Sequence, residues 1–312
     1  MRRFWMIAPP VAAAAVLLAL MPAAHGQASA ASLRPVSRGQ VPSAGVGVGA
    51  QYDAPHIYIQ HGQEKAFVDS WLDTFGGTAT DPLTLDVTPT PSETLSDIVL
   101  SPVGTLSVFD FSGGIPYPFG QESVGDMVSD FSPAVTAATR SGATVLVAPF
   151  NDPVGKDAIV QFPGGVDIQL WIHNVPADFS PLATIPDNRF YLDSAAAGPF
   201  IRDWLAFSHG HIAVDDGSAN GAEIGLPGAR YRKVLIDSAF GETLVIITNG
   251  QLPYPFGRDA MGYDVPDLSA TLAKAKTAGA QVLWGPYREP GLATAIVEFP
   301  GGYICELHQG TP

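Results

Sequence analysis

The chain has 312 residues, of which 30 are acidic and 16 basic, so its formal net charge is −14, and it contains one cysteine. The acidic balance argues against nucleic acid or an anionic membrane as a partner, and a lone Cys305 excludes an intramolecular disulfide. The length suffices for one large domain or two small ones, which a packed core must stabilise.

The first 30 residues are typical of a secretory signal peptide. Arg2 and Arg3 give a positive start, an apolar run follows from Val11 to Met21, and Ala28-Ser29-Ala30 fits a small-residue cleavage site. This run is shorter than the roughly 20 residues that span a bilayer. We therefore expect a secreted or periplasmic protein with no membrane part after cleavage; an uncleaved anchor is the alternative. Residues 31–54, rich in glycine, alanine and serine, are expected to form a flexible leader.

Two segments of the chain repeat one another. Residues 115–171 and 252–308 align without a gap at an offset of 137, and 24 of the 57 positions are identical. A match of this length indicates an internal duplication. We expect a first module over residues 55–173, a proline-containing linker over 174–188, and a second module over 189–310.

Each copy alternates strands and helices, which predicts a mixed class of fold. In the first copy, aromatic and aliphatic residues recur at helical spacing from Phe67 to Leu72, and Gly76-Gly77 should end that helix. In the second copy, Ser208 to Gly210 should end the equivalent helix, and a later helix should start with Asp267 as N-cap and stop at Gly279. The expected strands start near 56 and 189 and cover 95–100, 106–111, 234–236, 243–247, 281–283, 295–299 and 303–308.

The ending AIVEFPGGYICELHQ, the duplicated βαβββ pattern and the segment GYDVPDLSATLAKAKTAGAQVL resemble the vicinal oxygen chelate superfamily. This superfamily includes glyoxalase I, the extradiol dioxygenases and the bleomycin-resistance proteins. The resemblance covers roughly residues 55–309, and its most specific part is Phe299 to His308. It implies an α+β fold in which two tandem βαβββ modules form a curved, half-barrel mixed sheet, with the helices outside and a cleft inside.

The resemblance also implies a small-molecule ligand and a divalent metal ion such as Zn, Ni, Mn or Fe. In the superfamily, imidazole and carboxylate groups on the first and last strands hold the ion, which chelates two adjacent substrate oxygens and acts as a Lewis acid. His56 matches the first-strand position and Glu306 the last-strand position. The Glu306 position of the first copy holds Gln169, and the His56 position of the second copy holds Arg189.

Two interpretations of these positions stay open. In the first, His56, Gln169 and Glu306 bind the metal, and Glu306 also serves as the catalytic base. In the second, Arg189 pairs with Glu306, since first and last strands are expected to be neighbours in the sheet. That pair would compete with a metal, because a guanidinium cannot coordinate one.

Other side chains are expected to line the cleft or contact a ligand together with Arg189. His308 shares a strand face with Glu306, and Trp171 occupies the equivalent position in the first copy. Tyr117 and Tyr254 lie in twin PYPFG turns. A surface position is the alternative for His308, and a purely architectural role in the turn is the alternative for the two tyrosines.

The leading hypothesis is an exported glyoxalase-like protein that acts on or binds a small oxygenated molecule. If it is an enzyme, the expected reaction is a metal-dependent isomerisation, lyase step or dioxygenation. The alternative is a non-catalytic binding protein of the bleomycin-resistance type, which Arg189 favours. A third hypothesis, a domain for protein contacts only, applies if side chains fill the cleft. The sequence predicts neither the substrate nor the choice between a monomer and a homodimer.

Overall fold

A computed structural model describes residues 55–86, 93–113, 122–151, 155–174, 184, 186–249 and 259–311. The expected signal peptide and leader, and both tyrosines of the PYPFG turns, lie outside these residues. None of the helices in the described ranges is long and apolar enough to cross a membrane.

The first copy forms a nine-stranded sheet with the strand order β2-β4-β5-β1-β6-β9-β8-β7, and β3 also pairs with β4. Its elements are β1 (Pro55–Ile59), α1 (Glu64–Phe75), β2 (Thr78–Ala79), β3 (Leu83–Asp86), β4 (Glu93–Ser101), β5 (Gly104–Phe111), β6 (Glu122–Met127), α2 (Phe131–Arg140), β7 (Thr144–Asn151), β8 (Gly155–Phe162) and β9 (Val166–His173).

The second copy forms an eight-stranded sheet with the order β11-β12-β13-β10-β14-β17-β16-β15. Its elements are β10 (Asp187–Leu192), α3 (Ser194–Ser208), β11 (His211–Asn220), the 3₁₀ helix η1 (Gly221–Ile224), β12 (Arg230–Ser238), β13 (Gly241–Ile247), β14 (Asp259–Asp264), α4 (Leu268–Thr277), β15 (Gln281–Glu289), β16 (Leu292–Phe299) and β17 (Tyr303–Gly310).

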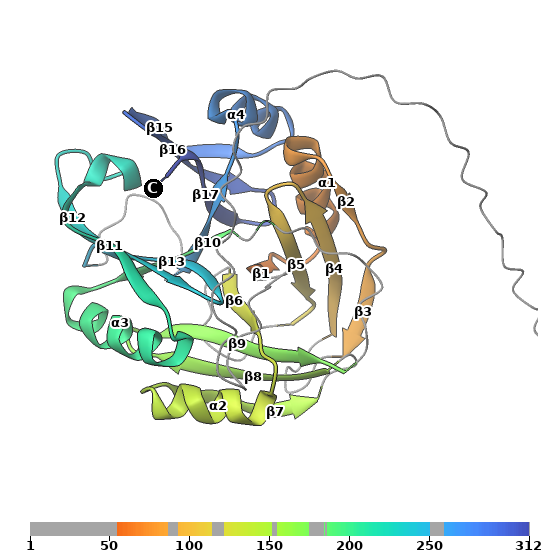
Figure 1. Ribbon diagram of the computed structural model, residues 1–312. Coiled ribbons are helices and arrows are strands. Elements are labelled where there is room, and N and C mark those ends of the chain that lie inside the picture. Colours follow the sequence, from red (N-terminus) through yellow and green to blue (C-terminus); the bar gives the residue numbers. More distant parts are fainter. Residues whose placement is uncertain are drawn as a thin grey trace, which may run out of the picture. The chain divides into compact units, whose positions relative to one another are not determined.

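Both sheets are built around an antiparallel pair of strands, β1 with β6 and β10 with β14. On either side of this pair a parallel neighbour follows, β5 and β9 in the first sheet and β13 and β17 in the second. Each sheet therefore contains the strand–helix–strand pattern twice. The sheets are strongly curved, as the change of direction from β4 to β8 shows in Figure 1. The predicted α+β class with two tandem modules in mixed sheets is confirmed.

The predicted helix ends are also confirmed. Helix α1 stops at Phe75, and Gly76 follows with a φ of 78°, a conformation that favours glycine. The side chain of Asp267 caps α4 by accepting a hydrogen bond from the amide of Ala270 at 3.0 Å. Strand β11 was not predicted, because most of its side chains are exposed, including Ile212 and Val214 at 42% each.

The helices cover the outer faces of the sheets and join the two copies in one core. Phe67 and Trp71 belong to α1 of the first copy, yet they contact rings of the second sheet. The ring of Trp71 lies 4.9 Å from that of Phe299 and 5.0 Å from that of Tyr263 between centroids. The ring of Phe67 meets that of Tyr303 edge-on at 5.7 Å.

The first helix of the second copy likewise contacts a ring of the first sheet. The ring of Phe162, at the end of β8, contacts three rings on α3. The centroid distances are 6.2 Å to Phe200, 5.5 Å to Trp204 and 5.6 Å to Phe207. The backbone amide of Gln60 donates a hydrogen bond of 3.0 Å to the carbonyl of Gly301, which ties the end of β1 to the turn before β17. The first helix of each copy thus contacts both sheets, and the two copies share one core.

Candidate functional site

Each sheet has an inner face, defined as the side turned away from the helices and the shared core. On β10, Phe190 and Leu192 join that core, whereas Arg189 and Tyr191 alternate to the other side. On β17, Cys305 and Leu307 join the core, whereas Ile304, Glu306 and His308 do not. Strand alternation therefore brings most of the predicted site residues to the inner faces.

The inner face of the second sheet holds a buried cluster of charged groups around Glu306. Arg189, Glu306 and His308 are each 3% exposed. A guanidinium nitrogen of Arg189 lies 3.2 Å from Oε2 of Glu306, and Nδ1 of His308 lies 2.8 Å from the same oxygen. The hydroxyl of Thr294 donates a hydrogen bond to Oε1 of Glu306. Asp187 completes the cluster, with Oδ2 at 3.7 Å from Arg189 and 3.8 Å from His308.

A glycine makes the pair of Arg189 and Glu306 possible. The expectation that β10 and β17 are direct neighbours is wrong, because β14 lies between them. A Cβ atom on Gly262 of β14 would come within 2.2 Å of Nε of Arg189. The absence of a side chain at this position lets the guanidinium cross over β14 and reach the carboxylate. The predicted ion pair is thus confirmed, although it spans two strand spacings.

The charges of this cluster depend on one another. Burial alone would raise the pKa of Glu306, but attraction to Arg189 and His308 outweighs it and lowers that pKa. Burial would lower the pKa of His308, yet its contacts with Glu306 and Asp187 raise it. The pKa of Asp187 is raised by burial in spite of its two cationic neighbours. Glu306 is therefore a stably ionised carboxylate and a poor proton acceptor.

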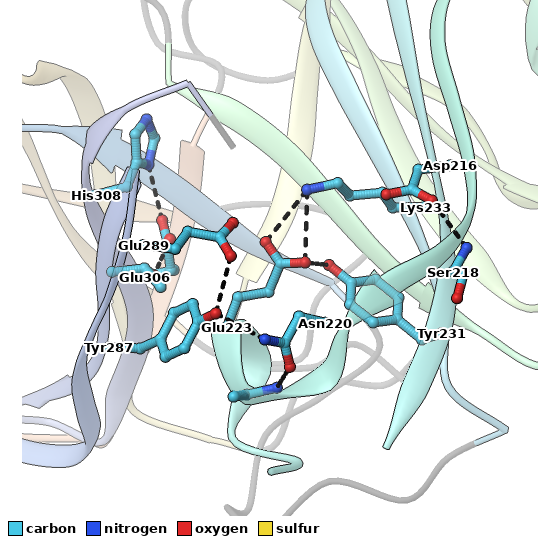
Figure 2. A network of polar contacts seen from close by, with 12 residues as sticks. Asp216, Ser218, Asn220, Glu223, Tyr231, Lys233, Tyr287, Glu289, Glu306 and His308 are labelled. Carbon is cyan, nitrogen blue, oxygen red and sulfur yellow. Dashed lines mark hydrogen bonds and ion pairs between the residues drawn. The ribbon is translucent and has the colours of Figure 1, made fainter. Parts of the chain in front are cut away.

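A polar network joins side chains of η1 and the outer strands of the second sheet, as Figure 2 shows. The hydroxyl of Tyr231 donates to Glu223 of η1 at 2.6 Å, and Lys233 lies 3.2 Å from the same carboxylate. From the opposite edge, the indole of Trp284 donates to the carbonyl of Ala222 at 2.8 Å. Because η1 follows β11 and Trp284 belongs to β15, these bonds link the two edges of the curved sheet.

Apolar side chains occupy the rest of this inner face. One buried cluster comes from β10 to β14 and the η1 region, and a smaller one from β16 and β17 with partly buried neighbours on β15. The members are Tyr191, Ala219, Ile224, Tyr231, Leu235, Leu244, Ile246 and Ala260, and then Ile296 and Ile304. Among the described residues, the inner face of the second sheet is largely filled by its own side chains.

The inner face of the first sheet is chemically different. Nδ1 of His56 lies 2.9 Å from Oε1 of Gln169, so the ring nitrogen donates to the amide oxygen. Nε2 of Gln169 donates to Oδ1 of Asp157 at 2.6 Å, and the hydroxyl of Tyr58 donates to Oε1 at 3.3 Å. A Cβ atom on Gly125 of β6 would come within 2.2 Å of the His56 ring, so this ring crosses a glycine as Arg189 does in the second sheet.

Aromatic rings line the rest of the first inner face. Tyr58 stacks on Phe109 at 5.5 Å and on Phe111 at 5.8 Å between centroids. The ring of His56 lies 5.5 Å from that of Phe109 and 6.4 Å from that of Trp171. Rings at these separations interact favourably beyond the area that they bury.

The predicted site residues thus separate into two groups. His56, Gln169 and Trp171 meet on the first sheet, whereas Arg189, Glu306 and His308 meet on the second. The members of the predicted metal set lie on two sheets, His56 and Gln169 on the first and Glu306 on the second. Within the described ranges, no group of three or more histidine, cysteine, aspartate or glutamate side chains is arranged to hold a metal ion.

Sequence reasoning missed several members of both groups. Asp157 and Thr294 occupy equivalent positions at the offset of 137, one next to Gln169 and the other next to Glu306. This equivalence could have pointed to them, because a partner of one copy's site residue is expected to have a counterpart in the other. Asp187 carried no such signal, because its counterpart at the offset of 133 is Ala54, which has no polar side chain.

We expect the protein to be more stable in mild acid than in mild base. Burial raises the pKa of Asp187, and desolvation together with nearby Asp187 and Asp237 raises that of Glu242 to about 7. A carboxyl group with a higher pKa in the folded state binds more protons there, so the free energy of unfolding falls as the pH rises through that range. His308 acts in the same direction, because its stabilising charge is lost as the pH passes its raised pKa. Urea denaturation should give a larger free energy of unfolding at about pH 5 than at about pH 8.

The control for this pH dependence is Glu242→Gln, which should reduce the difference between the two pH values. It should not abolish the difference, because burial also raises the pKa of Asp126 and, with Glu64 nearby, that of Asp97 to about 8. Glu306 opposes the trend only in stronger acid, where its lowered pKa is reached. Greater stability at the higher pH would contradict the assignment.

Comparison with known proteins supports the fold. No protein-family model and no curated protein sequence matches the chain. Among solved structures, a triple mutant of 4-hydroxymandelate synthase from Streptomyces coelicolor superimposes with a TM-score of 0.55 at 15% identity, over 83% of this chain and 92% of that one. A xylose isomerase-like TIM barrel/4-hydroxyphenylpyruvate dioxygenase fusion protein gives a TM-score of 0.49 at 15% identity, over 84% of this chain and 50% of that one. The first likeness shows that the two chains share a fold.

Proposed function

We propose that this chain is an exported small-molecule-binding protein that has the vicinal oxygen chelate fold but works without a resident metal ion. The observation that carries the proposal is the contact of 3.2 Å between Arg189 and Glu306. Glu306 occupies the position where the fold family would place a metal-binding carboxylate. The guanidinium of Arg189, and not a metal ion, neutralises its negative charge. Export rests on the signal-like N-terminal sequence alone.

The donor set around Glu306 does not fit a divalent ion. Oε1 accepts the hydroxyl of Thr294, and Oε2 faces both Arg189 and His308. A catalytic metal needs deprotonated ligands and an open coordination position for substrate. Here both carboxylate oxygens already have partners, and a fixed cation stands beside them. The lowered pKa also argues against Glu306 as a general base, because a weak base takes up a proton poorly near neutral pH.

The potential metal ligands of the first sheet are also engaged with one another. His56 uses Nδ1 to donate to Gln169, and the amide oxygen that could coordinate an ion already accepts that bond and one from Tyr58. The carboxylate of Asp157 already accepts from Nε2 of Gln169, which leaves one imidazole and one amide. These make a weak set for Zn, Ni, Mn or Fe, which prefer several imidazole or carboxylate ligands. Binding of a small molecule by hydrogen bonds and ring contacts fits these residues better than metal-assisted catalysis.

The first test is the metal content of the mature protein, purified without chelator and measured by elemental analysis. We expect less than about 0.1 equivalents of any divalent metal per chain in the natural protein. Arg189→His replaces the cation by a ligand beside Glu306 and His308, and should bind zinc or nickel near stoichiometrically. Arg189→Met, which removes the cation without adding a ligand, is the matched control and should bind less than the histidine variant.

A stoichiometric metal in the natural protein that is lost in Glu306→Gln would refute the proposal. It would favour instead a metal-dependent lyase, isomerase or dioxygenase. The likeness of the fold to 4-hydroxymandelate synthase keeps this second function in view. Turnover of α-ketoaldehydes or catechols would then be the measurement to make next.

A further inference from the structure

The two copies place different chemistry at equivalent positions of their inner faces. Tyr58 pairs in register with Phe109 as Tyr191 does with Ile246. The offset of 137 relates the residues of the last two strands. In the first copy the set is His56, Tyr58, Phe109, Asp157, Gln169 and Trp171, and in the second it is Arg189, Tyr191, Ile246, Thr294, Glu306 and His308. The first set is rich in rings and the second in charges that neutralise one another.

Solvent access also differs between the two sets. Phe109 and Gln169 on the first inner face are partly exposed. Their equivalents in the second sheet, Ile246 and Glu306, are 0% and 3% exposed. Solvent therefore reaches Phe109 and Gln169 on the first sheet in part, whereas the corresponding residues of the second sheet are buried.

The amide of Gln169 has a fixed orientation and one hydrogen left to donate. Its oxygen accepts from Nδ1 of His56, and its nitrogen donates to the carboxylate of Asp157 at 2.6 Å. The opposite orientation would set the amide oxygen against that carboxylate, so Asp157 holds the NH₂ group in place. An NH₂ group has two hydrogens, and among the described residues only Asp157 accepts one. The second can be donated to an oxygen of a ligand.

Phe109 supplies the second contact. Its ring belongs to the stack with Tyr58 and Phe111, and it also lies 5.5 Å from the ring of His56. A partly exposed ring that its neighbours hold in place offers a rigid surface for a flat ligand, because little side-chain freedom is lost on contact.

From this arrangement we infer that the ligand of this protein binds to the inner face of the first sheet, and that it is a flat aromatic molecule with an oxygen acceptor. The ring stacks at Phe109, and the oxygen accepts a hydrogen bond from Nε2 of Gln169. The second sheet takes no ligand at the equivalent place. This inference rests on the proposed function, which it makes more specific by naming the sheet and the ligand class.

Two matched pairs of probes test the inference by isothermal titration calorimetry on the mature, metal-free protein. Catechol and benzoate carry the ring and the oxygens; cyclohexane-1,2-diol and cyclohexanecarboxylate carry the same oxygens without the ring. We expect at least one aromatic probe to bind at least about tenfold more tightly than its saturated partner. Failure of both aromatic probes to bind at up to about 10 mM would overturn the inference.

Two equivalent variants locate the site. Phe109→Leu removes the ring but keeps an apolar side chain, and should weaken binding of the aromatic probe at least about tenfold. Ile246→Leu makes the matched change on the second sheet and should bind like the natural protein. Equal affinities in both variants, or a loss only in Ile246→Leu, would place the ligand elsewhere and overturn the inference. Such a result would leave the metal-free function standing, because metal content tests that function separately. Urea denaturation of both variants confirms that each is folded.

Discussion

Arg189→Met is expected to lower the free energy of unfolding by about 3 to 5 kcal/mol, because it leaves the carboxylate of Glu306 buried without its strongest counter-charge. His308 and Thr294 would still contact Glu306, but neither carries a permanent charge. The measurement is urea or guanidinium denaturation at neutral pH, followed by far-ultraviolet circular dichroism.

Two controls separate the buried pair from charge removal in general. Arg232→Met breaks the exposed pair with Asp215, which has a shorter N–O distance of 2.7 Å but 45% and 42% exposed side chains, and should cost less than about 1 kcal/mol. The double variant Arg189→Met with Glu306→Gln removes both charges and should recover most of the lost stability. If Arg189→Met and Arg232→Met had equal effects, Arg189 would not serve as the internal counter-ion that the metal-free function requires.

Trp71→Ala is expected to destabilise the whole fold, by about 3 to 5 kcal/mol. Trp71 is 0% exposed, and its indole nitrogen donates to Ser101 of the first sheet at 3.1 Å. Its ring lies within 5.0 Å of Tyr263 and Phe299 of the second sheet. Because this one side chain links both sheets, its loss should loosen them together.

Hydrogen exchange measured by mass spectrometry checks this cooperativity. In Trp71→Ala, exchange should rise in β9 of the first sheet and in β17 of the second by similar factors. Leu83→Ala is the control, since Leu83 is 62% exposed and its truncation should change stability by no more than about 0.5 kcal/mol. Faster exchange confined to the first sheet would show that the two copies are independent folding units.

Much of the fold could be predicted from the chain. The gapless repeat at an offset of 137 shows the duplication without any structure. Gly76 and Asp267 mark helix ends by local backbone chemistry, which does not depend on distant residues. The packing of each first helix against both sheets could not be predicted, because Phe67 and Phe200 have the same apolar spacing whichever sheet they cover.

The candidate site was predicted only in part. The pairing of Arg189 with Glu306 was one of two interpretations, and it assumed that their strands are direct neighbours, which they are not. Both copies keep a glycine at the crossing point, Gly125 and Gly262, but which side chain crosses it depends on the strand order. Likewise, nothing near Asp157 in the sequence shows that it fixes the amide of Gln169. The crossing over Gly262 and the contact of Asp157 with Gln169 both depend on the order of the strands in their sheets.

The sequence by itself determined the duplication, the strand and helix pattern, and which residue types each copy offers at the position of a fold-family ligand. These properties are local or come from comparing the chain with itself. Only the tertiary structure decided that His56 and Glu306 lie on different sheets, that Arg189 neutralises Glu306, and that Phe109 and Gln169 reach solvent while Ile246 and Glu306 do not. The physical reason is that burial and charge pairing depend on the order of strands in a sheet, which distant parts of the chain fix together.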